Sequence, residues 1–487
     1  MNYRMIFKTL GKILSIEGIL LIIPLIISLC NGENIYYAYL ISMGLMLLVG
    51  LPLALLKPSN RGMYVRDGFV LVGLCWIGLS LFGALPFFIS GEIPSYIDAL
   101  FETVSGFTTT GATILKDVEV MSKSLLFWRS FTHWIGGMGV LVFVLAILPN
   151  SEGQNIYLLK AESTGPQVGK LVSKVRFTAR ILYVIYLAMT VIMVALLLCG
   201  GNHLFDSVIL SMGTAGTGWF AILNSGLATY SSYTQIIVTI FMFLFGINFN
   251  IYYFILIGKV KQAFKNEELR WYVGIILMAA TIICLSLYFN ADKVLAGTAS
   301  WNVGDYIKHS FFQVVSIITT TGFSTTDFNV WPLLPKIVLF VLMFVGGCAG
   351  STGGGVKVSR FVILFKSLKR EVNKLIHPNS VSPINMDGET MDEGVVRGVT
   401  GYFALIIVLL FLGFFIVSFN NLDFESSFTA VVTCINNVGP GLGEEAYSSM
   451  ADFNIVSKIT LTITMLIGRL EVYPILLLFM PKVWSRK

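Results

Sequence analysis

The chain has 487 residues, of which 55% are hydrophobic and only 12% are charged, and its formal net charge is +6. With a mean hydropathy of +0.80, a soluble globular protein is excluded, because no soluble fold of this length buries so much apolar surface while exposing so little charge. The composition predicts a polytopic membrane protein. The six cysteines lie in or beside apolar stretches without a CxxC pair, so neither disulfides nor zinc are expected.

Apolar stretches long enough to cross a bilayer recur along the whole chain. We expect ten spans, at roughly 11–30, 36–56, 69–89, 125–148, 178–200, 233–257, 271–290, 334–365, 399–419 and 455–480. The residues before the first stretch show no obvious cleavage site, so the first stretch is expected to be a retained helix and not a signal peptide.

Four shorter apolar runs end in a turn rich in glycine and in threonine or asparagine. The runs begin at Tyr96, Phe205, Asp305 and Phe424, and the turns are 108–112, 215–219, 319–323 and 436–440. One glycine of each turn, namely Gly111, Gly218, Gly322 and Gly439, recurs at intervals of roughly 110 residues, which is typical of one membrane unit copied four times.

Basic residues group at alternate loops of this ten-span arrangement. The groups include Lys357 and Arg360, and by the positive-inside rule their face is cytoplasmic. Both termini are then expected there, and the four short runs enter from the other side. Acidic residues outnumber basic ones in the opposite loops, where Glu102 and Arg129 are counted, and this excess would concentrate cations at an outer vestibule. The alternative is that the positive-inside bias leaves acids outside by default.

The four turns have the composition of a cation filter. Irregular backbone at membrane depth is tolerated where it is buried in protein or lines a water-filled cavity. Glycine allows carbonyls to face inward, and uncharged hydroxyl and carbonyl oxygens suit a monovalent cation, whereas divalent sites need carboxylates. The alternative is Gly/Thr helix packing. The candidate filter residues are Thr109, Thr110, Gly111, Thr217, Gly218, Thr320, Thr321, Gly322, Asn437, Val438 and Gly439.

A glycine-rich stretch interrupts the expected span 334–365. Residues 346–355 contain six glycines, too many for a stable helix, because each costs up to about 1 kcal/mol relative to alanine. We expect a flexible loop; a phosphate-binding P-loop is excluded because Lys357 stands between two valines. The candidate gate residues in this loop are Gly347, Ala349, Gly350, Ser351, Thr352, Gly353, Gly354 and Gly355.

Arg469 lies near the middle of the last apolar segment, where a charge is costly unless it faces a polar interior. We expect its guanidinium to lie below the filter and to donate hydrogen bonds to carbonyls of the glycine-rich loop. The alternative is an arginine that ties helices together through backbone carbonyls. Glu471 is expected on another side of the same helix. The four histidines show no metal-ligand spacing, so no chemistry is assigned to them.

At these residues the chain resembles the TrkH/TrkG branch of the bacterial Trk/Ktr potassium-uptake superfamily. The matching segments are TTTGAT at 108–113, HWIGGMGVLVF at 133–143, TTTGFSTTDF at 319–328, GGCAGSTGGGVKV at 346–358, IHPN at 376–379, NNVGPG at 436–441 and GRLEVYP at 468–474. The second turn is the loosest match. Trp219 and Pro440 follow two of the glycines, where Ala112 and Phe323 follow the others, so a fourfold-identical ring is not expected.

The resemblance implies an all-α fold in which four helix–re-entrant loop–helix repeats surround a central pore behind two N-terminal transmembrane helices. The corresponding units are 1–68 for the N-terminal pair and 69–150, 151–260, 261–396 and 397–487 for the repeats, the third containing the gating loop and a cytoplasmic linker. Potassium would pass the four filter turns, with the glycine-rich loop and Arg469 obstructing the pore below them.

The resemblance also implies a multi-pass protein of the bacterial cytoplasmic membrane. It implies a homodimer on a cytosolic TrkA-like nucleotide-binding (NAD or ATP) regulatory protein. We expect no cofactor on this chain, K⁺ as the transported ion and no nucleic-acid partner. Two alternatives remain. An H⁺- or Na⁺-coupled symporter would usually carry carboxylates in its spans, where only Glu17 and Glu471 qualify. A polytopic membrane enzyme would need catalytic pairs in the spans, and the sequence shows none.

Overall fold

The computed structural model describes residues 1–57, 65–139, 175–291, 301–380, 382–443 and 449–484. The described chain is helical apart from loops and one short hairpin, formed by β1 (Asn385–Met386) and β2 (Glu389–Thr390). The expected all-α membrane fold is therefore confirmed.

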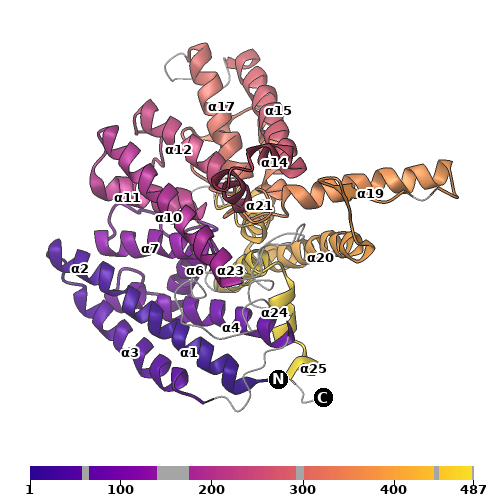
Figure 1. Ribbon diagram of the computed structural model, residues 1–487. Helices are drawn as coiled ribbons and strands as arrows, with labels where there is room; N and C mark the ends of the chain where they lie inside the picture. Colours follow the sequence, from indigo (N-terminus) through magenta and orange to yellow (C-terminus); the bar gives the residue numbers. More distant parts are fainter. Residues whose placement is uncertain (58–64, 140–174, 292–300, 381, 444–448, 485–487) are drawn as a thin grey trace.

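An N-terminal pair of spans packs on the outside of the first repeat. Helices α1 (Tyr3–Leu20) and α2 (Ile22–Cys30) form one apolar span, and α3 (Tyr36–Ala54) returns beside α1. Gly11 and Gly50 lie where α1 and α3 cross, and the absence of side chains lets the two backbones approach closely. The side chain of Tyr3 donates a hydrogen bond to the carbonyl of Trp484, so the two termini lie side by side (Figure 1).

Each repeat contains a first helix, a short pore helix and a second helix. The first helices are α4 (Val65–Gly83) with its extension α5 (Leu85–Ser90), α10 (Val175–Cys199), α15 (Glu267–Phe289) and α20 (Glu393–Val417). The pore helices are α6 (Tyr96–Phe107), α11 (Leu204–Gly216), α17 (Val303–Ile318) and α21 (Phe424–Asn436). They coincide with the four short apolar runs, and side chains of Ser95, Asn302 and Asp423 cap three of them.

All four second helices end early. They are α7 (Lys123–Gly137), α12 (Ser232–Phe245), α18 (Leu333–Val345) and α23 (Ile455–Arg469). The chain continues as α13 (Phe249–Leu256) and α14 (Val260–Lys265) after α12, as α19 (Val358–Ile376) after α18, and as α24 (Tyr473–Leu478) and α25 (Pro481–Trp484) after α23. The interruption of 334–365 was expected. Continuous helices over 233–257 and 455–480 were predicted and are wrong.

Glycines near two of these breaks let the second helix approach the pore helix closely. Side chains on Gly136 and Gly468 would collide with the carbonyls of Phe107 and Ile435 at the ends of the pore helices of the same repeats. After Phe245 the chain turns by 89°. Because of such breaks, six helical segments among the described residues are long and apolar enough to span a membrane, or seven with α12 and α13 together, instead of the ten expected. Residues 140–148 of the expected fourth span lie outside the described residues.

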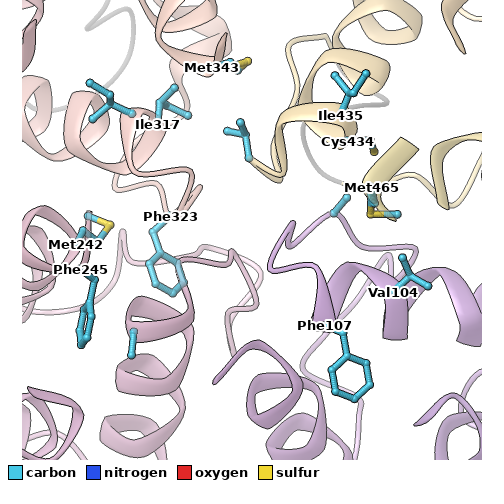
Figure 2. Close-up of a cluster of buried hydrophobic side chains, with 14 of the residues drawn as sticks. Val104, Phe107, Met242, Phe245, Ile317, Phe323, Met343, Cys434, Ile435 and Met465 are labelled. Atoms are coloured by element: carbon cyan, nitrogen blue, oxygen red, sulfur yellow. The ribbon is translucent and has the colours of Figure 1, made fainter. Parts of the chain in front are cut away.

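The repeats close into a ring because each second helix packs against the pore helix of the next repeat. Helix α7 contacts α11, α12 contacts α17, α18 contacts α21, and α23 contacts α6. Figure 2 shows apolar side chains contributed by all four repeats, among them Phe107, Phe245, Phe323 and Met465. This apolar packing holds the ends of the pore helices close to one another. Helix α19 projects away from the ring (Figure 1).

Candidate ion-conduction site

The same strained backbone turn follows all four pore helices. One residue in each turn has a left-handed conformation, with φ of 55°, 56°, 58° and 54° at Thr109, Thr217, Thr320 and Asn437. A residue with a Cβ avoids this region at a cost of roughly 1–2 kcal/mol, so its recurrence at four equivalent places needs strong support from the surroundings.

A hydrogen bond at each helix end supplies part of that support. The residue after the left-handed one donates its N–H to a carbonyl five residues back, at 2.9 Å in every repeat. The donor–acceptor pairs are Thr110–Ser105, Gly218–Gly213, Thr321–Ser316 and Val438–Thr433. In this alignment Gly218 corresponds to Thr110, Thr321 and Val438. The predicted equivalence of Gly218 with the other three glycines is therefore shifted by one residue.

Buried hydroxyl and amide groups connect the turns. Thr108 and Thr110 share a hydrogen bond of 2.8 Å between their hydroxyls, and Thr319 and Thr321 do the same at 2.8 Å. The side-chain amide of Asn437 donates to the Thr110 hydroxyl at 2.9 Å, which joins the fourth repeat to the first. The predicted filter residues therefore converge from separate repeats, and their oxygens carry no formal charge.

The glycine-rich loop between α18 and α19 lies directly against two of these turns. The N–H of Gly355 donates to the carbonyl of Asn436 at 2.8 Å, and the N–H of Gly354 donates to the Thr320 hydroxyl at 2.6 Å. The loop also contacts the break after α12, because the N–H of Cys348 donates to the Gly246 carbonyl at 3.0 Å. The loop thus bridges the second, third and fourth repeats.

Arg469 joins this loop to the first repeat. Its guanidinium donates to the carbonyl of Thr352 at 2.9 Å and to the carbonyls of Gly136 and Gly137 at 2.5 and 2.8 Å. The contact with a loop carbonyl is of the kind expected from the sequence. Its setting differs, because Arg469 is the last residue of α23 and not the middle of a continuous helix.

Comparison with known proteins identifies the family of the chain. The chain matches the family model TrkH, cation transport protein, over residues 38–486. The chain belongs to the TrkH family. The Trk system potassium uptake proteins TrkH of Halomonas elongata and Escherichia coli K12 are 32% and 34% identical over 495 and 490 residues, covering 100% and 99% of this chain and 100% of each relative.

A solved structure gives the same assignment. The crystal structure of the potassium transporter TrkH from Vibrio parahaemolyticus matches with a TM-score of 0.88 at 31% identity, over 100% of both chains. The resemblance drawn from the motifs is confirmed. Together with the apolar spans, membership of the TrkH family indicates an inner-membrane transport protein.

A buried ion pair supports the first filter turn of this TrkH-family chain. Arg129 and Glu102 are 2% and 0% exposed, and their side chains meet at 2.5 Å. Glu102 also accepts from the N–H of Ile114 at 3.0 Å, and Arg129 lies 3.5 Å from the ring of Phe220. Both charges were expected in outer loops, and this is wrong, because both side chains are buried beside the first turn. There the ion pair and its further hydrogen bonds offset the free-energy cost of removing the charges from water.

A second buried network anchors the glycine-rich loop. Glu268 on α15 accepts from the N–H groups of Ala349 at 2.7 Å and Ser359 at 3.1 Å, so one carboxylate holds both sides of the loop. Lys357 donates to the Gly353 carbonyl. Lys357 is 1% exposed, so its assignment to the cytoplasmic surface was wrong. A charge beside a glycine run was the available signal.

The break after α23 carries a related contact. Glu471 has φ of 54° in the turn, and its carboxylate meets Arg360 on α19 at 2.5 Å. The Arg360 guanidinium also lies 4.1 Å from the Tyr402 ring. Arg360 was expected at the cytoplasmic surface and Glu471 within a helix. Both predictions are wrong, since the helix ends first and its turn reaches the start of α19.

His133 lies directly behind the second turn. Its Nδ1 is 2.6 Å from the Gly106 carbonyl, its ring stacks on Phe220 at 4.1 Å, and a Cβ on Gly218 would lie 2.5 Å from its Nε2. The sequence gave no reason to assign His133 a role. Because it contacts parts of the first two repeats, it helps to set their relative position.

The segments that follow the filter turns line a cavity of about 320 Å³. Its wall includes Thr113, Trp219, Asn224 and Asp327, from the first three repeats. Asn224 fixes one side, since its amide donates to Asp117 at 2.7 Å. This hydrogen bond and one from the backbone N–H of Glu119 hold the pKa of the Asp117 carboxyl below its ordinary value.

Proposed function

We propose that the chain takes up potassium ions across the cytoplasmic membrane through a gated, channel-like pore with a four-loop filter. The observation that carries this proposal is the left-handed turn that recurs after all four pore helices, with the Asn437 amide joining the fourth of these turns to Thr110 of the first. The names of the relatives, potassium uptake proteins, support the same ion.

The filter turns suit an ion that must bind and then leave. Their hydroxyls and carbonyls can replace water around a monovalent cation, and the predicted filter residues include no carboxylate that would hold a divalent cation tightly. The hydrogen bonds between Thr108 and Thr110 and between Thr319 and Thr321 keep the turns in place when an ion passes. The filter turns are therefore suited to let a monovalent cation pass and not to hold it tightly.

The gate is the glycine-rich loop together with Arg469. A buried guanidinium repels cations, and the Arg469 contact with Thr352 pins the loop below the filter. The loop runs straight into α19, which projects from the ring. A pull on α19 would move Arg360 and Lys357 and so withdraw the loop.

A regulatory protein would supply that pull. We expect a cytosolic TrkA-like nucleotide-binding partner, because α19 presents the exposed Lys369 and Lys374 to a docking surface. Lys366 and Arg370 of the same helix pair with Glu267 and Glu393 of this chain. Helix α19 also has apolar side chains on its surface, since Leu368, Val372 and Leu375 are exposed. A second copy of the chain would cover such apolar side chains, which supports a homodimer.

Flux measurements test the proposal. The purified chain is reconstituted into vesicles, and radioactive Rb⁺ uptake is measured with and without the nucleotide-binding partner under an outward K⁺ gradient. We expect uptake that is low alone, rises with partner and nucleotide, and reverses at the K⁺ equilibrium potential. Partner-independent uptake at full rate would contradict the gate, and equal permeation of K⁺ and Mg²⁺ would contradict the filter.

A coupled symporter is the second candidate, and Glu17 is the observation that favours it. This carboxyl lies in α1, is 2% exposed, and has no hydrogen-bond partner among the described residues. A buried membrane carboxyl is a candidate for carrying a proton. If coupling occurs there, E17Q shifts the reversal potential, measured with a pH gradient across the membrane, towards that of K⁺ alone. A reversal potential that E17Q leaves unchanged under the same pH gradient excludes coupling through Glu17.

A further inference from the structure

The outer part of the filter differs in one repeat. Two residues after the left-handed residue, the first, third and fourth repeats have Gly111, Gly322 and Gly439, with φ of 84°, 82° and 103°. At the same place the second repeat has Trp219, which is not among the residues with positive φ. The first, third and fourth repeats therefore present a glycine backbone at this level, and the second repeat presents the side chain of a tryptophan.

Distances place the side chain of Trp219 between the other three repeats. A Cβ built on Gly111, Gly322 or Gly439 would lie 2.6, 2.9 or 3.0 Å from the Cβ of Trp219. Three chain segments from three repeats can all face one Cβ only if that atom lies where they converge. Gly218, by contrast, faces His133, behind the turn.

The indole continues from this point into the cavity beyond the turns. Trp219 is half-buried and lines that cavity together with Thr113 and Asp327. Its Cε3 would lie 3.6 Å from a Cβ on Gly439, so the ring remains close to the fourth repeat. The side chain thus lies between the cavity and the four turns. The indole therefore borders both the cavity and the glycine level of the turns.

We propose that Trp219 closes the outer end of the filter and limits the size and the rate of the cations that enter. The inference rests on the proposed potassium pore and deepens it. The three flanking glycines leave room for the indole to lie across the opening. The π face of the indole is a surface that attracts a partly dehydrated cation.

Removing the indole gives the decisive test. W219G gives the second repeat the glycine that the other three have, W219A removes the ring, and W219F keeps an aromatic group of smaller size. Uptake of Rb⁺ and of the larger Cs⁺ is measured in vesicles with the partner present. We expect Rb⁺ uptake to rise in the order Phe, Ala, Gly, with W219G at least about tenfold above the unchanged protein, equivalent to about 1.4 kcal/mol of barrier, and the Cs⁺ to Rb⁺ ratio to rise with it.

Controls separate this inference from the pore itself. W301F changes a tryptophan that stacks on His309 and is not among the predicted filter residues, and we expect it to leave uptake unchanged. If G322S abolishes uptake while W219A and W219G leave both the rate and the Cs⁺ ratio unchanged, the pore stands and the role of Trp219 is overturned. If G322S has no effect, the proposed pore itself fails. Should W219G not fold, W219A decides the question alone: higher uptake supports the closure, and equal or lower uptake overturns it.

Discussion

The four repeats are alike in the backbone of the proposed filter and unlike in the level below it. In the filter, four repeats adopt one left-handed turn with one hydrogen-bond length, although their sequences differ. Below it, the second, third and fourth repeats differ from one another: the second bends by 89°, the third forms the glycine-rich loop, and the fourth contributes Arg469. Coordinating an ion requires oxygens from all sides, whereas blocking it requires one obstruction. Symmetry is therefore retained in the backbone turns proposed to bind the ion and lost at the level proposed to close the pore.

Breaking the shared backbone should have the largest effect. A Cβ on Gly322 would lie 2.5 Å from the Val438 carbonyl and 2.7 Å from Pro440 Cδ, and φ of 82° is unfavourable for any other residue. We expect G322S to lower Rb⁺ uptake by at least about a hundredfold, or about 2.7 kcal/mol of barrier. G274S is the matched control, because nothing lies within 4 Å of its Cβ position. Normal uptake by folded G322S would mean that the turns do not coordinate the ion.

A change in the proposed gate below the filter should raise uptake, whereas G322S should lower it. R469A removes the hydrogen bonds from Arg469 to Thr352, Gly136 and Gly137 and releases the loop. We expect uptake without the partner to rise by about tenfold, which is about 1.4 kcal/mol of barrier. R397A removes an exposed arginine from α20 and should change nothing. Unchanged or lower uptake by folded R469A would make the arginine a structural tie.

Removing the carboxylate of Glu268, which holds both ends of the glycine-rich loop, should have a smaller effect than R469A. E268A leaves the buried N–H groups of Ala349 and Ser359 without their acceptor, at a cost of about 1–3 kcal/mol each. We expect a lower melting temperature and a rise in partner-independent uptake below that of R469A. E268Q keeps an acceptor oxygen and should recover part of both. A lower melting temperature with unchanged uptake would show that Glu268 supports the fold without restraining the gate.

The smallest effect is expected outside the ring. N224A removes the hydrogen bonds that join the segments after the first two filter turns. A hydrogen bond contributes about 0.5–1.5 kcal/mol to stability. Since Asn224 is not among the predicted filter residues, only part of this free energy should reach the ion, and we expect the KM for Rb⁺ to rise by at most about threefold with unchanged maximal rate. S225A is the neighbouring control. A large fall in maximal rate would place the cavity wall within the conduction machinery.

The candidate site was predictable where chemistry is carried by composition. Glycine and threonine after a short apolar run indicated the four pore helices, and the glycine run 346–355 indicated the break before α19. Other features left weaker signals. The endings of α7, α12 and α23 depend on how closely a pore helix approaches, as at Gly136 and Gly468, and a hydropathy window does not detect this. The same limitation placed Arg360 and Glu102 at surfaces when each is buried against an opposite charge.

The sequence by itself determined the membrane class, the fourfold repeat, the filter composition and the family resemblance, because each follows from residue type and spacing. Only the tertiary structure decided which backbone positions are equivalent. Counting glycines aligns Gly218 with Gly111, yet the hydrogen bond from Gly218 to Gly213 places Trp219 at that level instead. A turn is defined by which carbonyl accepts each N–H, and that choice is made by the end of the helix and by the neighbours packed around it, not by the identity of one residue.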